Sequence, residues 1–534
     1  MGVLMIRSWL VIGMLMLVTG CSSGSPMDEA GEVRQDEKLA GQPDRSNTVV
    51  IGMPGEPQTF NPDARPDDYF YAPAQNIYSR LIKLNNNQEI IPDLARSWTV
   101  SEDGKEITFE LQEGVVWHDG QPFTSQDVKF TLDSIMEQKG AAVDNLSSLQ
   151  SVRTPDQHTV ILTLKHPDAT FLGYLAWYAT FVMPEHIYQG EQWDSGTRIS
   201  PIGTGPFKFK EYTPGVKLIL ERNEQYFGQI PSVDRLVFSI MPDPNTMVQA
   251  FYNGELDIFG TDPPITEVTR MEERGDINIT KKVFPSRYYL VFNTAKPPFD
   301  QPEVRRAIAY ALNNEEIVNK AMKGQGQASS SFLSPVYSWA LSEKYKLPEY
   351  DPAEAGRMLE QAGLKPDAKG NYLTITFKLF QDGTFSDIAT VIKDQLQQAG
   401  IHVQIEVKEY AAWQEEVVQG RNYDMSMLGG YQGPDVGAIA NRVSTSGSNN
   451  IMGYSNAKLD EALQQAALLI APTTRKVHYE EVQRILSEDM PIYPVSEWIS
   501  MNPVHEYVKG DPASAEAVGY TGFSEYNYVR MIQD

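Results

Sequence analysis

Residues 94–128 read LARSWTVSEDGKEITFELQEGVVWHDGQPFTSQDV, and this stretch carries a clear structural pattern. Within it, Ile107, Phe109 and Leu111 alternate with polar residues. Alternation with a period of two is typical of a strand that buries one face. The sequence therefore predicts a half-buried β-strand at 107–111.

A turn is predicted a few residues further on. Asp119 and Gly120 stand just before Pro122, a combination that favours a turn. The neighbouring His118 is the one histidine that invites a catalytic interpretation. The seven histidines are scattered, however, and no two lie within four residues of each other. We therefore interpret His118 as part of the turn.

Both strand and helix patterns recur along the rest of the chain. Further strands are predicted at 160–164, 216–223 and 235–241. Helices with one apolar face are predicted at 302–312, 457–470 and 474–488. The expected buried faces are Val304, Ile308, Ala311 and Leu312; Leu459, Leu463, Ala466 and Ile470; and Val482, Ile485 and Leu486. At about 150 residues per domain, this mixture without a repeat predicts an α/β or α+β protein of several lobes.

The composition is that of a globular protein. Hydrophobic residues make up 41% of the 534 positions and charged residues 22%. Asp and Glu (70) outnumber Lys and Arg (45), which gives a formal net charge of −25. Because this charge repels phosphate backbones, nucleic acid is not expected as a partner. The single cysteine excludes an intrachain disulfide and a cysteine-based metal cluster.

The N-terminus predicts export and lipid attachment. Arg7 precedes an apolar run at 9–18, which is too short to span a bilayer but fits a secretory signal segment. Val18-Thr19-Gly20-Cys21 resembles the lipobox of bacterial lipoproteins, where cleavage precedes the cysteine and a lipid is attached to its thiol. We therefore expect a signal peptide at 1–20 and lipidation of Cys21. The alternative is a buried cysteine in a short core helix.

The segment after the cysteine predicts a tether. Residues 22–46 are rich in Gly, Ser, Pro and charge and nearly lack large apolar side chains. Such a segment cannot bury enough surface to offset its chain entropy. Residues 21–46 are thus expected to form a lipidated, flexible tether. No other stretch approaches membrane length, so the body is expected outside the cytoplasm and anchored only by lipid.

The chain carries none of the common catalytic signatures. It lacks a phosphate-binding Gly-x-x-x-x-Gly-Lys loop, a Gly-x-Ser-x-Gly elbow and a His-Glu-x-x-His zinc helix. We expect no enzymatic activity, no metal and no cofactor. What the sequence offers instead is aromatic, amide and carboxylate groups in segments expected to be loops, a combination that suits a ligand pocket. The candidate contacts are Tyr69, Phe70, Tyr71, Trp413, Tyr431, Gln432, Asp435 and Asn450.

Five blocks in order along the chain carry a family resemblance. They are 94–98 with 104–109; 114–120 with 123–128; 202–208 with Asn223, Tyr226 and Phe227; 292–293 with 298–300 and 304–308; and 453–456 with Leu459 and Asp460. Together they resemble the family 5 (cluster C) extracytoplasmic solute-binding proteins of ABC importers, which include oligopeptide-, dipeptide- and nickel-binding members. The candidate contacts stand where members of this family line their cleft.

The resemblance implies an α/β fold of the type II periplasmic-binding-protein kind, with two lobes, an extra inserted domain and a ligand cleft between the lobes. The first lobe would comprise 47–82, 194–282 and 491–534, the inserted domain 83–193, and the second lobe 283–490. The implied protein is a monomer whose partners are a small solute, an ABC permease and its ATPase.

The ligand class stays open at this point. Peptide-binding relatives carry an Asp just after a Gly-Trp pair near residue 430, which pairs with the ligand's α-ammonium. Here Gly433 falls about where that Asp would be, with Asp435 as an offset substitute. The alternatives to a peptide are an oligosaccharide or another polar solute. A ligand-sensing receptor and, less favoured, a secreted hydrolase are the other possible functions.

Overall fold

The computed structural model describes residues 47–64, 68–177, 179–190, 200–510 and 525–532. The predicted signal peptide, Cys21 and the tether lie outside the described residues. Within the described part of the chain, no helix is both long and apolar enough to cross a lipid bilayer.

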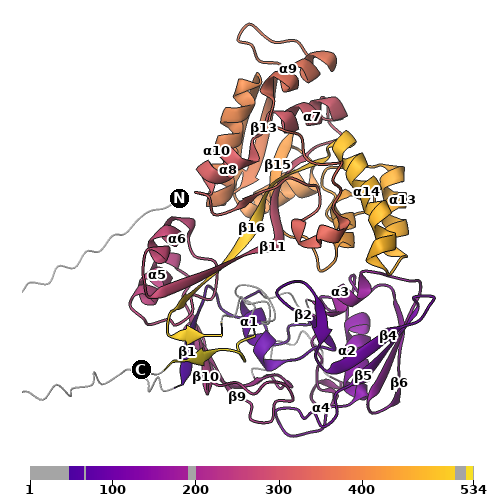
Figure 1. Cartoon of the computed structure of the whole chain (residues 1–534), viewed down its shortest axis with the longest axis vertical. Coiled ribbons are helices and arrows are strands. Elements are labelled where there is room, and N and C mark those ends of the chain that lie inside the picture. Colours follow the sequence, from indigo (N-terminus) through magenta and orange to yellow (C-terminus); the bar gives the residue numbers. More distant parts are fainter. Residues whose placement is uncertain (1–46, 65–67, 178, 191–199, 511–524, 533–534) are drawn as a thin grey trace, which may run out of the picture. The chain divides into compact units, whose positions relative to one another are not determined.

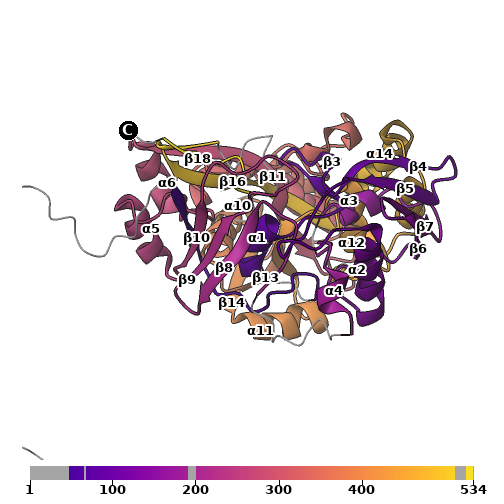
Figure 2. The ribbon, with the colours of Figure 1, turned by 90° about the horizontal axis from the view of Figure 1, so that it is seen from below.

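One four-stranded sheet contains two of the predicted strands. Its order is β1 (Thr48–Met53), β10 (Arg235–Ile240), β9 (Lys217–Arg222) and β8 (Phe207–Thr213). β1 runs parallel to β10, and the other pairs are antiparallel. Figure 2 shows β8, β9 and β10 side by side. The predictions of strands at 216–223 and 235–241 are confirmed.

A second four-stranded sheet, entirely antiparallel, contains the stretch quoted first. Its order is β4 (Ala95–Val100), β5 (Glu106–Leu111), β7 (Thr159–Leu164) and β6 (Leu149–Asp156). Ile107, Phe109 and Leu111 are buried as predicted, and so are the alternate residues of β7. The turn at His118 is confirmed as well, because the Gly120 amide donates to the Trp117 carbonyl over 2.8 Å and Gly120 has a φ of 87°.

A six-stranded mixed sheet forms the largest layer. Its order is β12 (Gln327–Ala328), β16 (Ile492–His505), β11 (Ile277–Phe292), β15 (Met425–Tyr431), β13 (Leu373–Phe380) and β14 (Ile401–Lys408). The long strands β11 and β16 pair antiparallel and extend beyond this sheet (Figure 1). At their far end Val504 bridges to Ile258, which also bridges to Ile51 of β1. Two continuous strands therefore connect the six-stranded sheet with the β1 sheet.

The remaining elements are short strands and helices. Two small sheets pair β2 (Ile82–Leu84) with β3 (Ile90–Pro92) and β17 (Val508–Lys509) with β18 (Arg530–Met531). The helices are α1 (Asp68–Ile77), α2 (Ser125–Gln138), α3 (Phe171–Leu175), α4 (Glu185–Tyr188), α5 (Pro244–Tyr252), α6 (Ile265–Glu272), α7 (Pro302–Tyr310), α8 (Asn314–Ala321), α9 (Pro352–Gln361), α10 (Gly383–Gln398), α11 (Tyr410–Trp413), α12 (Ala440–Val443), α13 (Ala457–Ala467) and α14 (Pro472–Asp489). Three short segments have tighter or wider helical geometry: η1 (Pro335–Ala340), η2 (Gln414–Gln419) and η3 (Val436–Ile439).

The three predicted helices are α7, α13 and α14, and their apolar faces are buried with one exception. Ile470 is 44% exposed, so the prediction that it belongs to the buried face is wrong. The physical reason is that α13 ends at Ala467, because Pro472 begins α14 only a few residues later. Helix α14 begins two residues earlier than predicted, with that proline in its first turn.

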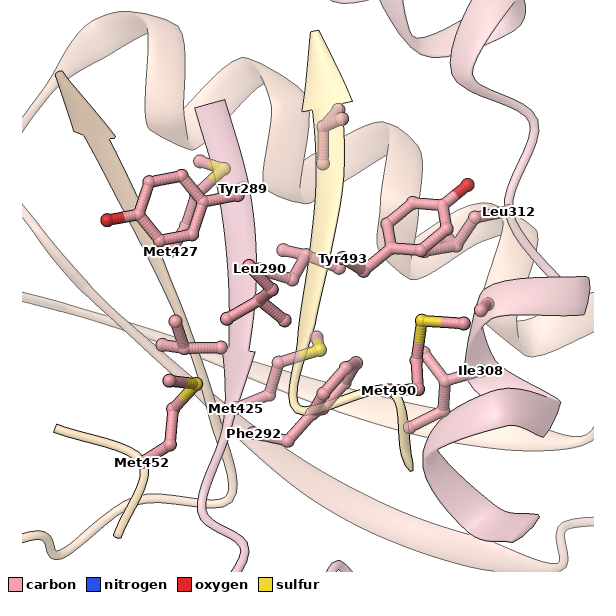
Figure 3. Packing of buried hydrophobic residues seen from close by; sticks show 14 of the residues in the cluster. Tyr289, Leu290, Phe292, Ile308, Leu312, Met425, Met427, Met452, Met490 and Tyr493 are labelled. Atoms are coloured by element: carbon pink, nitrogen blue, oxygen red, sulfur yellow. The ribbon is translucent and has the colours of Figure 1, made fainter. Parts of the chain in front are cut away.

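The core of the six-stranded sheet is dense in methionine and aromatic side chains. Tyr289 and Leu290 of β11 lie close to Met427 of β15, and Tyr493 of β16 lies beside Leu312 (Figure 3). All five are at most 4% exposed. Burying each such side chain contributes about 1.5–3 kcal/mol, so this layer is the stable frame that holds the end of β15 in place.

Candidate ligand-binding site

Tyr431, the last residue of β15, lies at the centre of an aromatic stack. Its ring stacks on Trp177 at a centroid distance of 4.6 Å and on Phe284 at 5.3 Å, with interplanar angles of 29° and 23°. Its hydroxyl donates a hydrogen bond to the Oε1 of Gln88 over 3.0 Å. The antiparallel pairing of β15 with β11 brings Phe284 next to Tyr431. One side chain thus joins three segments that are far apart in the sequence.

A small cavity of about 30 Å³ adjoins this stack, and we call it the Tyr431 cavity. Its lining residues are Tyr71, Gln75, Arg80, Lys83, Leu84, Asn85, Gln88, Ala176, Trp177, Phe284 and Tyr431. A space of this size holds about one water molecule. The surrounding side chains therefore leave no room for a larger ligand. A larger ligand enters only if some of these side chains move apart.

Arg80 brings a guanidinium to the wall of the cavity, within electrostatic reach of the buried carboxyls of Asp63, Asp93 and Glu525. Its Nη1 donates to Gln75 Oε1 over 2.6 Å, and its Nη2 donates to the hydroxyl of Tyr71. The guanidinium also lies 3.7 Å from the centre of the Phe181 ring. Both of these hydrogen-bond acceptors are uncharged. A carbonyl or carboxylate group in the cavity would therefore meet a guanidinium that these neutral contacts hold in place.

Lys83, in contrast, is neutralised within the protein. Its Nζ lies 2.8 Å from Glu525 Oε1 and 3.6 Å from Asp93 Oδ1. Burial alone would lower the pKa of Lys83, but the attraction of these two carboxylates outweighs it and raises that pKa. The ammonium therefore stays charged and ties the segment that carries Glu525 to the cavity wall. Its role here is to hold the wall together.

The three predicted aromatics at 69–71 have separate environments, because they lie in α1 and not in a loop as expected. Phe70 is fully buried and packs edge-on against Phe60, so it belongs to the core. Tyr69 is 42% exposed and lies over Gly55. Tyr71 lines the Tyr431 cavity, donates to the Trp177 carbonyl over 3.2 Å and has its pKa raised to about 12 by burial.

Trp413 lies in the core of the six-stranded sheet and does not line the Tyr431 cavity. It is the last residue of α11 and is 3% exposed. Its Nε1 donates to Ser426 Oγ over 3.2 Å, and its ring packs edge-on against Phe380 at 5.1 Å. These contacts are those of a packing residue.

Asp435 caps η3 and pairs with an internal cation. Its carboxylate accepts hydrogen bonds from Arg475 over 2.9 and 2.5 Å and from the Gly437 amide over 2.7 Å. Gln432 and Asn450 are also engaged locally. The Gln432 side chain donates to the Gly430 carbonyl over 2.6 Å, and the Asn450 side chain donates to two carbonyls and accepts from the Tyr454 amide. Of the eight candidates, the structure thus brings only Tyr71 and Tyr431 to the Tyr431 cavity.

Sequence reasoning missed Arg80, Gln88, Trp177 and Phe284. Trp177 stands at the end of the apolar stretch FLGYLAW (171–177), a pattern that predicts core more readily than cleft. Phe284 lies within the long strand β11, where an aromatic residue is ordinary. The roles of Trp177 and Phe284 become visible only from the stacking of their rings on Tyr431.

The described residues contain no obvious catalytic or metal centre. No group of three or more His, Cys, Asp or Glu side chains in that part of the chain could hold a metal ion. His118 is engaged by backbone groups, since its Nε2 lies 3.0 Å from the Gly205 carbonyl and its Nδ1 accepts from the Gly203 amide over 3.2 Å. The arrangement around Tyr431 suits non-covalent binding of a polar molecule with flat or carbonyl-bearing parts.

Comparison with known proteins agrees with this fold. A family model described as bacterial extracellular solute-binding proteins, family 5 Middle, matches residues 89–450, and the chain belongs to this family of solute-binding proteins. It is 28% identical over 509 residues to the oligopeptide-binding protein AppA of Bacillus subtilis, covering 91% of this chain and 92% of AppA. It is 27% identical to the dipeptide-binding protein of Escherichia coli, covering 87% of this chain and 92% of that protein.

Solved structures give the same result for the fold. The ABC transporter substrate-binding protein CtaP of Listeria monocytogenes matches with a TM-score of 0.82 and 25% identity over 91% of this chain and 99% of its own. DppA of Helicobacter pylori, solved with the peptide STSA, matches with a TM-score of 0.74 and 25% identity over 91% of this chain and 98% of its own. The predicted family and the α/β fold of the type II periplasmic-binding-protein kind are therefore confirmed.

Proposed function

We propose that this chain is the extracytoplasmic substrate-binding lipoprotein of an ABC importer, and that it captures a peptide or a similar polar solute and delivers it to the permease. The observation that carries this proposal is the position of Tyr431. Its ring and hydroxyl join Trp177, Phe284 and Gln88, which come from separate parts of the chain, beside one cavity. Several relatives are named for binding peptides, which supports a peptide as ligand.

Ligand contacts are proposed from both sides of the cavity. Tyr71, Arg80 and Gln88 would act from one side, and Phe284 and Tyr431 from the other. Arg80 would meet carbonyl or carboxylate oxygens, and the rings would cover apolar or planar parts of the ligand. We retain the predicted lobes, 47–82 with 194–282 and 491–534 against 283–490, and the inserted domain 83–193, as part of the proposal.

Ligand entry would require opening about β11 and β16. These two strands extend from the six-stranded sheet toward the β1 sheet, their pairing is irregular between Val283 and Arg287, and a cavity of about 30 Å³ is too small for a peptide. We expect the radius of gyration to fall when a verified ligand saturates the protein, because the ligand contacts both sides only when they approach each other. An unchanged radius of gyration in small-angle scattering would count against closure.

Anchoring is proposed to depend on Cys21. Acyl chains on its thiol would hold the protein at the membrane, since each buried CH₂ contributes about 0.8 kcal/mol. Replacing the residue, Cys21→Ser, should release the protein into the soluble fraction of an envelope preparation. Membrane retention of the Ser variant would contradict the lipoprotein assignment.

The experiment that tests the proposed function is identification of the bound solute. The protein is purified from its native envelope without denaturation, and the ligand is released by acid and identified by mass spectrometry. We expect peptides or another defined polar solute, recovered unchanged after prolonged incubation with the protein. Turnover of that solute would instead favour a hydrolase, and an intact uptake rate in a deletion strain would favour a sensing role.

A further inference from the structure

A second cavity, of about 330 Å³, lies away from Tyr431 and is lined largely by methionine, proline and aromatic side chains. We call it the methionine cavity. Four methionines line it: Met241, Met247, Met322 and Met501. Methionine is unbranched and polarisable, so a wall of such residues adapts to apolar groups of different shape.

One flat aromatic surface completes this wall. Tyr288 of β11 and Trp498 of β16 stack at a centroid distance of 6.1 Å and an interplanar angle of 18°. Trp498 is 36% exposed and thus leaves part of its ring open to solvent. The two rings belong to the strands that connect the six-stranded sheet with the β1 sheet, so an occupant of this cavity would contact those strands directly.

Among the described residues that line the methionine cavity, only Asp262 carries a formal charge. Its Oδ2 accepts a hydrogen bond from Trp498 Nε1 over 2.6 Å, and its Oδ1 accepts one from the Met501 amide over 2.7 Å. Both donors are neutral. Among the described residues no Lys, Arg or His forms an ion pair with Asp262, and burial raises the pKa of this carboxyl to about 6. The carboxylate therefore lacks a countercharge.

The neighbouring Lys281 does not supply a countercharge to Asp262. Lys281 donates to Gln325 Oε1 over 2.7 Å at the cavity wall, but its Nζ also lies 2.6 Å from Glu272 Oε1 and is neutralised there. Burial raises the pKa of Tyr288, and the negative charges of Asp382 and Asp262 raise it further. Because Asp382 caps α10, the side of the cavity that faces α10 is negative as well. A cation in the cavity would be attracted by Asp262, and Lys281 would not take its place because it pairs with Glu272.

We propose that the methionine cavity receives the first residue of a peptide ligand, with the α-ammonium against Asp262 and an apolar side chain against the methionines and the Tyr288–Trp498 surface. This inference rests on the proposed function and names the part of the ligand that the cavity selects. An ammonium on a short apolar stem matches a cavity that is apolar apart from one uncompensated carboxylate. Asp435, the acid that the sequence offers as a substitute partner for the ammonium, is already paired with Arg475.

The test compares two peptides that differ only at this ammonium. Binding of Leu-Gly-Gly and N-acetyl-Leu-Gly-Gly to the full-length wild-type protein is measured by titration calorimetry at pH 7.5. Removing one partner of a buried charge pair costs 2 kcal/mol or more, so acetylation should weaken binding by about 30-fold or more. Equal binding of the two peptides would overturn the inference while leaving the proposed function intact. Failure of both to bind, with another solute identified as the ligand, would overturn the inference together with the peptide assignment.

A variant pair supplies the second measurement. In Asp262→Asn the preference for the free amine over the acetylated peptide should fall from about 30-fold to about 3-fold or less. Glu273→Gln is the matched control, because it removes one negative charge at the end of the neighbouring α6 from an exposed position. A preference that persists in the Asn variant, or that falls equally in the control, would contradict direct contact with Asp262. If the Asn variant does not fold, the two-peptide comparison on the wild type decides alone.

Discussion

Arg475 and Asp435 form a two-point ion pair in which the guanidinium nitrogens lie 2.9 and 2.5 Å from the two carboxylate oxygens. The Arg475 side chain is 4% exposed and that of Asp435 17%. The Arg475 guanidinium also lies 5.2 Å from the Trp339 ring and donates to the hydroxyl of Tyr479. The pair therefore fixes η3, which follows the strand that carries Tyr431, to helix α14.

Replacing Asp435→Ala should destabilise the fold. Arg475 would be left buried without its countercharge, a change that costs about 3–5 kcal/mol. Urea unfolding should show this loss as a lower midpoint with an unchanged slope. Glu461→Ala, an exposed acid on α13, is the control and should change stability by less than about 0.5 kcal/mol. A fully stable Asp435→Ala variant that no longer binds ligand would instead make Asp435 a direct contact.

The Tyr431 stack should dominate ligand affinity. Tyr431→Ala removes both ring contacts and the hydrogen bond to Gln88, so binding of the identified solute should weaken by about 2–4 kcal/mol. Tyr431→Phe keeps the ring between Trp177 and Phe284 and should lose only about 1 kcal/mol. Calorimetry of the two variants measures this difference. Equal affinities for the Ala variant and wild type would place the ligand elsewhere.

Trp413→Ala should lower stability and spare binding. The indole is 3% exposed and packs on Phe380 in the core of the six-stranded sheet, and truncation of such a side chain costs about 3–5 kcal/mol. Thermal melting and calorimetry on the same sample separate the two effects. Tyr410→Ala, which removes the 54% exposed ring stacked on Trp413, should cost much less. Native melting with lost binding would restore Trp413 as a ligand contact.

The stability of the fold should depend on pH through Asp63. Burial raises the pKa of its carboxyl from 3.8 to about 8, against the opposing effects of the Phe181 amide and Arg80. The folded state thus holds a proton that the unfolded state has already released, so this residue reduces stability as pH rises from about 4 to about 8. Asp63→Asn stays neutral and removes this dependence.

Urea unfolding of both proteins at several pH values checks the sign. The stability of Asp63→Asn minus that of wild type should grow by about 1.4 kcal/mol for each unit between pH 5 and pH 7 and level off above pH 8. Taking the difference in unfolding free energy between the variant and the wild type cancels the contributions of the carboxylates that both proteins share. A difference that is constant with pH would show that Asp63 titrates normally.

The frame of the fold was largely predictable because its signals are local. The alternation of Ile107, Phe109 and Leu111 depends only on one strand having a buried face, and these residues are buried as predicted. The boundary error at Ile470 arose because the apolar pattern continues beyond the end of α13, where chain direction changes before Pro472.

The candidate site was less predictable because an aromatic residue gives the same sequence pattern whether it lies in a hydrophobic core or in a ligand cleft. Trp413 and Phe70 are aromatic and near polar residues, yet both lie in cores. The commitment of Asp435 depends on Arg475, which stands 40 positions further along the chain. No local sequence pattern predicts the pairing of Asp435 with Arg475. The stacking of Trp177 on Tyr431 is likewise a long-range contact that no local pattern predicts.

The central claim is that this protein binds a solute beside Tyr431. Native mass spectrometry of the full-length protein, purified from its own envelope as wild type and as Tyr431→Ala, tests it most directly. We predict that the wild type carries an additional mass that acid treatment releases, and that the Ala variant, folded by its melting curve, does not. An additional mass retained by the Ala variant, or a wild type that is ligand-free even after incubation with a peptide mixture, would contradict the claim.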